Sequence, residues 1–160
     1  MPRSVTRRYA LTVGLSSLLL ACARNGGLGS GQRVSANDQP LKATVYRRPG
    51  CPCCGGYVEY LRQNGFEAQV FDVADLAALK REYNVPKALE GCHTTIAEAY
   101  AIEGHVPADV VKRLLFEKPA IRGISLPGMP AGSPGMGGAK TAPFTIFEIS
   151  DKTGKVYAVE

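Results

Sequence analysis

Hydrophobic positions in the first half of the chain alternate in some segments and recur at helical spacing in others. Alternation between Pro40 and Pro49 is typical of a strand, whereas Val58 and Leu61 lie about one helical turn apart. The pattern predicts strands over residues 41–47 and 68–73 and helices over residues 55–64 and 75–83. A strand, a helix and a second strand in this order imply a parallel pair with a right-handed crossover.

The second half of the chain is less regular. Four apolar residues at helical spacing predict a helix over residues 107–116. Residues 92–103 are ambiguous, because their β-branched residues favour a strand and their alanines favour a helix. Residues 144–149 and 155–159 predict a terminal hairpin with Gly154 in its turn. The expected fold class is therefore α/β: a thioredoxin-like mixed sheet flanked by helices, with an irregular insert before the terminal hairpin.

The first 22 residues have the composition of an export signal. Three arginines precede an apolar run from Ala10 to Ala21, which is too short to be a comfortable transmembrane helix. The run ends in Leu19-Leu20-Ala21-Cys22, which resembles the lipobox of bacterial lipoproteins, whose cysteine is acylated. An ordinary signal peptide with an incidental cysteine is the alternative. The predicted organisation is a signal peptide with the lipidation site Cys22 over residues 1–22, a flexible tether over residues 23–40 and a folded domain over residues 41–160.

Removal of the leader leaves a nearly neutral chain. The sequence has 19 basic and 14 acidic residues, and without Arg3, Arg7 and Arg8 the count is 16 to 14, a net charge of +2. So small a charge argues against nucleic acid as a partner. Ala23, and no retention aspartate, follows the predicted lipidation site. We therefore expect an exported, lipid-anchored protein that faces the periplasm, on the outer membrane rather than the inner one.

Four cysteines remain after the lipobox. Cys51, Cys53 and Cys54 lie within four residues of one another, and Cys92 is distant in sequence. Two structural disulfides are the simplest account of four cysteines outside the cytosol. Adjacent cysteines such as Cys53 and Cys54 bridge only with strain, however, so this spacing indicates a chemical role.

Two chemical roles fit the cysteine motif. The segment Val45–Cys54 resembles the strand and active loop of glutaredoxins, with Cys51 and Cys54 at the two cysteines of Cys-Pro-x-Cys. In a redox role, Cys51 at a helix start is the nucleophile and Cys54 resolves the mixed disulfide. In a metal-binding role, three thiolates converge, and soft thiolates select copper(I), zinc or iron–sulfur clusters. In a dithiol catalyst, Cys53 is an extra thiol that could form an unproductive disulfide. In a metal site, Cys53 is a third ligand, and we therefore favour the metal-binding role.

Further ligands for a soft metal occur outside the motif. Cys92 and His93 supply a fourth thiol and an imidazole, and His105 supplies a second imidazole. Met129 and Met136 supply thioethers, which copper(I) accepts and zinc does not. Each also has a structural alternative: a buried cysteine, a core histidine or a methionine that packs a loop. We predict a copper(I) site that includes Cys92, with the histidines and methionines as secondary candidates and zinc as the alternative metal.

Residues 128–138 form a segment without periodicity that contains five glycines, two prolines and two methionines. This composition excludes a regular helix or a central strand. Loops of this length in compact domains are usually functional or disordered. Our hypothesis is that the segment closes over the cysteines as a lid, with Met129 or Met136 shielding or binding the metal. The alternative is a hydrophobic clasp over the edge of the sheet.

Four motifs in one order resemble the CopG-like bacterial copper-resistance family, also known as domain-of-unknown-function family 411. The motifs are Cys51-Pro52-Cys53-Cys54, Gly91-Cys92-His93-Thr94, Ile102-Glu103-Gly104-His105-Val106-Pro107 and the run from Pro127 to Met136. The resemblance spans about residues 43–159. It implies a thioredoxin-like periplasmic domain that binds copper through Cys51, Cys53 and Cys54 and, less firmly, through Cys92.

The resemblance says little about turnover. We favour a protein that buffers or passes copper over an enzyme, with no assigned catalytic residue. The alternative is a thiol-disulfide or copper-dependent oxidoreductase, in which Cys51 and Cys54 are the reactive pair. The expected partners are copper ions, other periplasmic copper proteins and the membrane that holds the lipid anchor.

Overall fold

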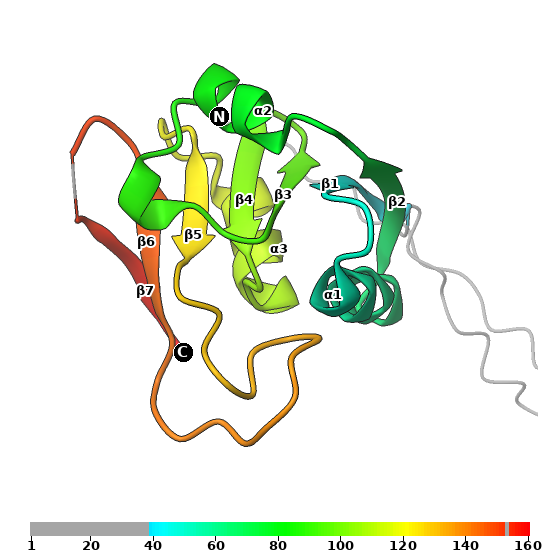
Figure 1. Ribbon diagram of the computed structural model, residues 1–160. Coiled ribbons are helices and arrows are strands. Elements are labelled where there is room, and N and C mark those ends of the chain that lie inside the picture. Colours follow the sequence, from blue (N-terminus) through cyan, green and yellow to red (C-terminus); the bar gives the residue numbers. More distant parts are fainter. Residues whose placement is uncertain (1–38, 153) are drawn as a thin grey trace, which may run out of the picture. The chain divides into compact units, whose positions relative to one another are not determined.

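The fold is a single mixed sheet covered by helices. A computed structural model describes residues 39–152 and 154–160. The predicted signal peptide, Cys22 and residues 23–38 of the predicted tether lie outside this range. Within the described residues, no helix is both long and apolar enough to cross a membrane. Seven strands are hydrogen-bonded in the order β2-β1-β3-β4-β5-β6-β7 (Figure 1).

Most helices and strands lie within a few residues of their predicted bounds. They are β1 (Leu41–Arg47), α1 (Pro52–Gln63), β2 (Phe66–Asp72), α2 (Leu76–Glu82), the 3-10 helix η1 (Lys87–Leu89), β3 (His93–Ala97), β4 (Tyr100–Gly104), α3 (Ala108–Glu117), β5 (Gly123–Leu126), β6 (Thr145–Ile149) and β7 (Val156–Val159). β1 has the predicted bounds. α1 starts three residues earlier than predicted, because Pro52 occupies its first turn, where no backbone N–H is needed. Asp75 caps α2 by accepting a hydrogen bond from the Ala78 N–H at 2.9 Å.

The secondary structure of two segments was not predicted from the sequence. The ambiguous residues 92–103 form the antiparallel hairpin β3–β4, with Glu98 in the turn at φ 49°. β5 was not predicted, because it has only four residues and begins with a glycine. Gly123 is required there, since a Cβ atom would lie 1.8 Å from the Ala101 carbonyl oxygen of β4. Residues 128–138 contain no helix or strand, as predicted.

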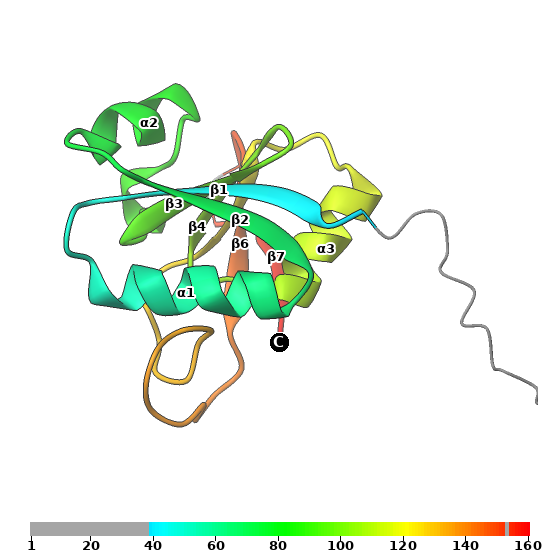
Figure 2. The ribbon, with the colours of Figure 1, turned by 90° about the vertical axis from the view of Figure 1, so that its right-hand side faces the viewer.

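Helices cover both faces of the sheet. α1 and α3 pack on one face, where their apolar side chains meet those of β1, β4, β5 and β6. η1 and the segment that follows α2 contribute to a smaller cluster on the other face, formed by Val85, Leu89, Ala101 and Ile149. Figure 2 shows α1 and α2 on opposite sides of the strands. The predicted mixed sheet flanked by helices is confirmed, and the narrower thioredoxin-like assignment stays a prediction.

The strand directions bring three segments together at one end of the strands β1, β3 and β4. β1 and β3 run antiparallel with Arg47 opposite His93, and β3 and β4 form an antiparallel hairpin. The end of β1, the start of β3 and the end of β4 therefore lie together. The loop after β1 leads into α1, Cys92 precedes β3, and His105 follows β4. Residues that are far apart in sequence therefore lie close together at this end of the strands.

Candidate metal centre

The cysteine motif forms the start of α1. Gly50 has a positive φ of 74°, and the Cys51 N–H donates to the Arg48 carbonyl at 3.3 Å, so the chain turns sharply out of β1. Cys51 is the N-cap, and Cys53 and Cys54 lie in the first helical turn. The N–H groups of a first turn have no acceptors within the helix, and the helix dipole favours negative charge there. This position suits thiolate ligands.

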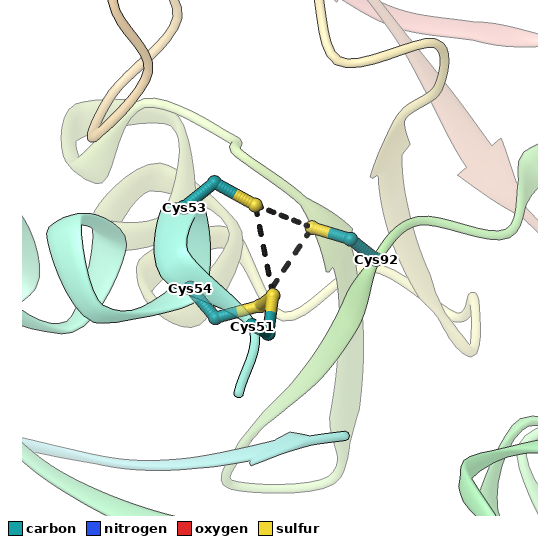
Figure 3. A group of neighbouring side chains, drawn as sticks. All are labelled: Cys51, Cys53, Cys54 and Cys92. Carbon is teal, nitrogen blue, oxygen red and sulfur yellow. Dashed lines mark hydrogen bonds between the residues drawn. A yellow bond between two sulfur atoms is a disulfide. The ribbon is translucent and has the colours of Figure 1, made fainter. Parts of the chain in front are cut away.

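Four sulfur atoms meet at this point, as Figure 3 shows. Cys51 and Cys54 are joined by a disulfide, and Cys53 and Cys92 are free thiols. The Cys53 Sγ lies 3.6 Å from the Cys51 Sγ and 3.6 Å from the Cys92 Sγ. The Cys54 Sγ lies 3.9 Å from the Cys92 Sγ. All four sulfurs lie within 4.8 Å of one another.

The spacing between the sulfurs matches what one metal ion requires. Thiolates bound at about 2.3 Å to a tetrahedral ion lie about 3.8 Å from each other. Three of the five non-bonded separations, at 3.6, 3.6 and 3.9 Å, fall around that value. Reduction of the disulfide gives four thiol ligands from a single small volume. In the disulfide form only Cys53 and Cys92 keep free thiols.

The sulfurs can be reached from outside. Cys54 is fully buried, whereas Cys51, Cys53 and Cys92 are half-buried. A cavity of about 360 Å³ opens beside Cys51 and Cys92. Its other walls come from the loop after β1, from α2 and from the segment before β3, namely Arg48, Pro49, Gly50, Leu76, Lys80, Glu90 and Gly91. An ion or a small ligand can approach the cluster through this cavity.

Two imidazoles lie on the other side of Cys92. The Cys92 Sγ is 3.3 Å from His93 Nδ1 and 3.3 Å from His105 Nε2. His105 Nδ1 lies 2.6 Å from the Pro134 carbonyl oxygen. Because a carbonyl only accepts, Nδ1 of His105 carries the hydrogen, and its neutral Nε2 presents a lone pair to Cys92. Both histidines are fully buried.

The ring of Tyr57 in α1 packs against both histidine rings. Its ring centroid is 4.7 Å from that of His93 and 5.3 Å from that of His105. The Tyr57 hydroxyl donates to the Val106 carbonyl at 2.9 Å, and burial raises the pKa of Tyr57 above its usual value. Aromatic packing and this hydrogen bond together fix the orientation of the imidazoles.

Burial sets the protonation of Cys92 and of the two histidines. Burial, with the charges of His105 and Lys80, lowers the pKa of His93 to about 3. Burial also lowers the pKa of His105. Both rings are therefore neutral at pH 7 and keep a nitrogen lone pair. Burial, followed by the hydrogen bond with Cys53, raises the pKa of Cys92 to about 12, so a metal bound by its thiolate must displace a proton.

A buried ion pair supports the segment that carries Cys92. The Glu103 carboxylate pairs with the Lys80 ammonium, and both side chains are buried. Glu103 also accepts from the Gly91 N–H at 2.7 Å and from the Thr94 hydroxyl at 2.5 Å. Lys80 donates to the Gly91 carbonyl at 3.2 Å. Because both backbone groups of Gly91 are bonded to this pair, the residue before Cys92 is held in place.

No role was predicted for Lys80 or Glu103 from the sequence, although Glu103 lies in one of the four motifs. A signal was present for each. Lys80 lies four residues after Leu76, on the buried side of α2, where a lysine is unexpected. Glu103 lies in the fully buried strand β4. Two opposite charges on otherwise apolar faces indicate a buried pair, but the sequence alone does not show that they meet.

The glycine-rich segment 128–138 contacts the site through its backbone. Gly135 packs on α1 so closely that a Cβ atom would lie 2.4 Å from the Tyr57 nitrogen. The Pro134 carbonyl next to it bonds His105. Met129 has a positive φ of 47° and is 41% exposed, and Met136 is half-buried. The segment thus positions an imidazole, while ligation by the methionine thioethers stays a prediction.

Comparison with known proteins agrees with this geometry. Residues 89–136 match a family model described as "Protein of unknown function, DUF411". Two solved structures, "Copper resistance protein copG- Form 1" and "Copper resistance protein copG- Form 2", are each 33% identical to this chain and superpose with a TM-score of 0.69. Each match covers 76% of this chain and 98% of the other. A search of curated proteins found no match.

Fold and site together define a mixed α/β protein with a sulfur- and imidazole-rich cluster that could hold a metal ion. The chain belongs to the CopG-like DUF411 family. The family model covers Cys92, both histidines and both methionines but not the cysteine motif of α1. The solved structures span most of the chain and therefore support the family over a longer segment.

Proposed function

We propose that this protein binds copper(I) through the thiolates of Cys51, Cys53, Cys54 and Cys92, and that it buffers or passes copper. The observation that carries the proposal is the convergence of four sulfur atoms within 4.8 Å at an accessible helix start. Soft thiolates favour copper(I). Both similar solved structures are named as copper resistance proteins, which supports copper as the metal. Zinc, which also takes four thiolates, is the alternative.

Binding by all four sulfurs requires the reduced protein. Metal ligation uses thiolates, and a disulfide between Cys51 and Cys54 removes two of the four. The oxidised form therefore keeps only Cys53 and Cys92 as thiol ligands. We infer that oxidation of this pair lowers the copper(I) affinity of the site, because two of the four thiolates are lost.

We propose the following cellular setting. The export signal and lipobox indicate a lipid-anchored protein that faces the periplasm, on the outer membrane, where other copper proteins are its donors and acceptors. Intact-mass analysis tests the anchor: residues 1–21 should be absent and Cys22 should carry lipid, and retention of residues 1–21 would contradict it. We also propose a thioredoxin-like core, which is supported by the parallel pair β1–β2 and the antiparallel order β1-β3-β4.

Replacement of Cys53 by serine tests the copper site. The variant loses one soft ligand, and even residues outside the coordination shell commonly change metal affinity by about 10- to 100-fold. We expect at least about a 100-fold loss of copper(I) affinity in anaerobic competition with a chelator. Wild-type affinity in Cys53→Ser would contradict the proposed ligand set.

A thiol-disulfide oxidoreductase is the second candidate, and the Cys51–Cys54 disulfide favours it. Such an enzyme needs Cys51 and Cys54 but tolerates Cys53→Ser. A disulfide-reduction assay with insulin therefore separates the two functions. Insulin reduction that is abolished by Cys51→Ser and kept by Cys53→Ser, together with unchanged copper affinity in Cys53→Ser, would establish the second candidate over the first.

A further inference from the structure

The end of the domain at which the chain enters β1 carries an exposed aromatic ring. The Phe116 side chain, in the last turn of α3, is 88% exposed, more than any other large apolar side chain among the described residues. Beside it lies a hollow of about 510 Å³, lined by Gln39 and Leu41 at the start of β1 and by Lys112 and Lys118 near the end of α3. We propose that this end, which we call the entry face, lies against the bilayer that holds the lipid anchor, with the Phe116 ring at the boundary between headgroups and acyl chains. This orientation rests on the lipid anchor of the proposed function and is independent of the copper site.

Phe116 lies outside the apolar stripe that packs α3 on the sheet. Val110, Val111, Leu114 and Leu115 of α3 are buried, so the Phe116 ring is not needed for this packing. Single exposed apolar side chains are common on protein surfaces, and the position of this one therefore decides its meaning. An aromatic ring gains free energy when it leaves water for the boundary between headgroups and acyl chains, where the apolar side chains of membrane-bound helices are buried.

The entry face is the part of the domain that lies closest along the chain to the anchor. Gln39 is the first described residue, and it lines the hollow beside Phe116. Residues 23–38 separate Gln39 from the predicted lipidation site Cys22, and a segment of this length spans at most about 55 Å when fully extended. The anchor thus keeps Phe116 within reach of the bilayer, at an effective concentration that lets one weak contact set the orientation of the domain.

The sulfur cluster lies at the opposite end of the strands. β1 runs from Leu41 at the entry face to Arg47 before the cysteine motif, and a rise of about 3.3 Å per residue separates the two by about 20 Å. The turn of the β3–β4 hairpin, at Glu98, also lines the hollow, whereas Cys92 and His105 flank the other ends of these strands. Figure 2 shows the start of β1 near α3 and the start of α1 at the far end. With the entry face on the bilayer, the cavity beside the sulfurs points away from it and stays open to a partner that exchanges copper.

The lysines of the entry face have acidic neighbours, so the contact depends on the apolar ring. The Lys118 Nζ lies 3.0 Å from a Glu98 carboxylate oxygen, which ties the end of α3 to the β3–β4 turn. The Lys112 Nζ lies 3.8 Å from an Asp109 carboxylate oxygen. Both lysine side chains are exposed and long enough to keep their ammonium groups among the headgroups while the Phe116 ring goes deeper. Because these charges are balanced, salt should change the contact little.

A tryptophan in place of Phe116 tests the orientation directly. The chain contains no tryptophan, so the tryptophan emission of Phe116→Trp comes from one side chain. Phe71→Trp is the matched control, because Phe71 is also an exposed aromatic residue but lies opposite Tyr46, near the end of β1 that leads to the cysteine motif. Each lipidated full chain is inserted through its anchor into vesicles of phosphatidylethanolamine and phosphatidylglycerol, with plain or brominated acyl chains. We expect brominated lipid to quench Phe116→Trp strongly and Phe71→Trp little, and acrylamide in the water to do the reverse.

Three quenching results would overturn the proposal. The first is emission of Phe116→Trp that acrylamide quenches and brominated lipid does not. The second is emission that neither agent quenches, because protein then covers the ring, either residues 23–38 or a second copy of the chain. The third is equal quenching of both variants by brominated lipid, because the domain then has no preferred face.

Flotation of the vesicles separates this proposal from the anchor on which it rests. A wild-type chain that does not float with the vesicles contradicts the anchor and the orientation together. A chain that floats while brominated lipid leaves Phe116→Trp unquenched overturns the orientation alone. The copper site is intact in both variants, so neither result depends on the copper(I) proposal.

Discussion

The sulfur side and the imidazole side of this site share Cys92 but differ in burial. Cys51 and Cys53 are half-buried at a helix start beside a cavity, whereas His93 and His105 have no exposed surface. The sulfurs can therefore exchange a metal with a partner, and the imidazoles are part of the core. Substitutions on the sulfur side should change binding with little effect on stability, and substitutions on the imidazole side should change both.

The largest effect on stability is expected at the buried ion pair behind Cys92, which belongs to the core, as the two histidines do. Lys80→Met leaves the Glu103 carboxylate buried without its partner, which typically costs about 3–5 kcal/mol. Urea unfolding of the reduced, metal-free protein measures this loss. Cys53→Ser, in contrast, should change stability by about 1 kcal/mol or less. Equal losses in the two variants would contradict the expectation that the half-buried sulfurs contribute less to stability than the buried core.

Acid should destabilise the imidazole side. His93 has a pKa of about 3 in the folded protein and an ordinary value near 6.5 when unfolded, so the unfolded chain binds more protons as pH falls. The contribution of neutral His93 to the free energy of unfolding is complete above pH 6.5 and is lost as pH falls towards 3. At pH 4 the loss due to His93 is about 3 kcal/mol. Urea midpoints of metal-free wild type and His93→Gln at pH 7 and pH 4 test this, because the variant should show a smaller pH dependence.

Contact between the glycine-rich segment and α1 should be sensitive to one methyl group. In Gly135→Ala the new Cβ meets the Tyr57 nitrogen at 2.4 Å, and φ is positive, so we expect a loss of about 1–3 kcal/mol. Gly137→Ala is the matched control, because nothing lies within 4 Å of its Cβ position. The His105 resonances should move in Gly135→Ala alone. Identical behaviour of the two variants would show that the segment does not dock.

The methionines should have the smallest effect. Met129→Leu with Met136→Leu keeps the apolar volume and removes both sulfurs, and Met129 is already 41% exposed. Unfolding free energy should change by about 0.5 kcal/mol or less. If a thioether contributes a weak bond, copper(I) should pass to a chelator faster, by roughly tenfold or less, which corresponds to about 1.4 kcal/mol. Unchanged copper release would leave the segment with a packing role only.

Local features of this protein were readable from its sequence. Alternation gave β1 its observed bounds, helical spacing placed the start of α1 within three residues, and the helix predicted over residues 75–83 begins at Asp75, which caps α2. Each depends on residues within one turn or one strand, where propensity and steric rules act directly.

Contacts between segments that are distant in sequence could not be predicted from the sequence. β5 owes its place to a glycine that fits against the Ala101 carbonyl, and its four residues carry no periodicity. The pairing of Lys80 with Glu103 joins α2 to β4, and the Pro134 carbonyl reaches His105 across 29 residues. The sequence indicated the ligand types but not which of them share Cys92.

The central claim is that reduced Cys51, Cys53, Cys54 and Cys92 together bind copper(I). Copper X-ray absorption of the reduced full chain, loaded without oxygen with one equivalent of copper(I), tests it most directly. We predict a coordination shell made of sulfur atoms, of which at most two remain, with lower copper affinity, when the Cys51–Cys54 disulfide is formed. A shell of nitrogen or oxygen atoms, or the same sulfur shell in the disulfide form, would contradict it.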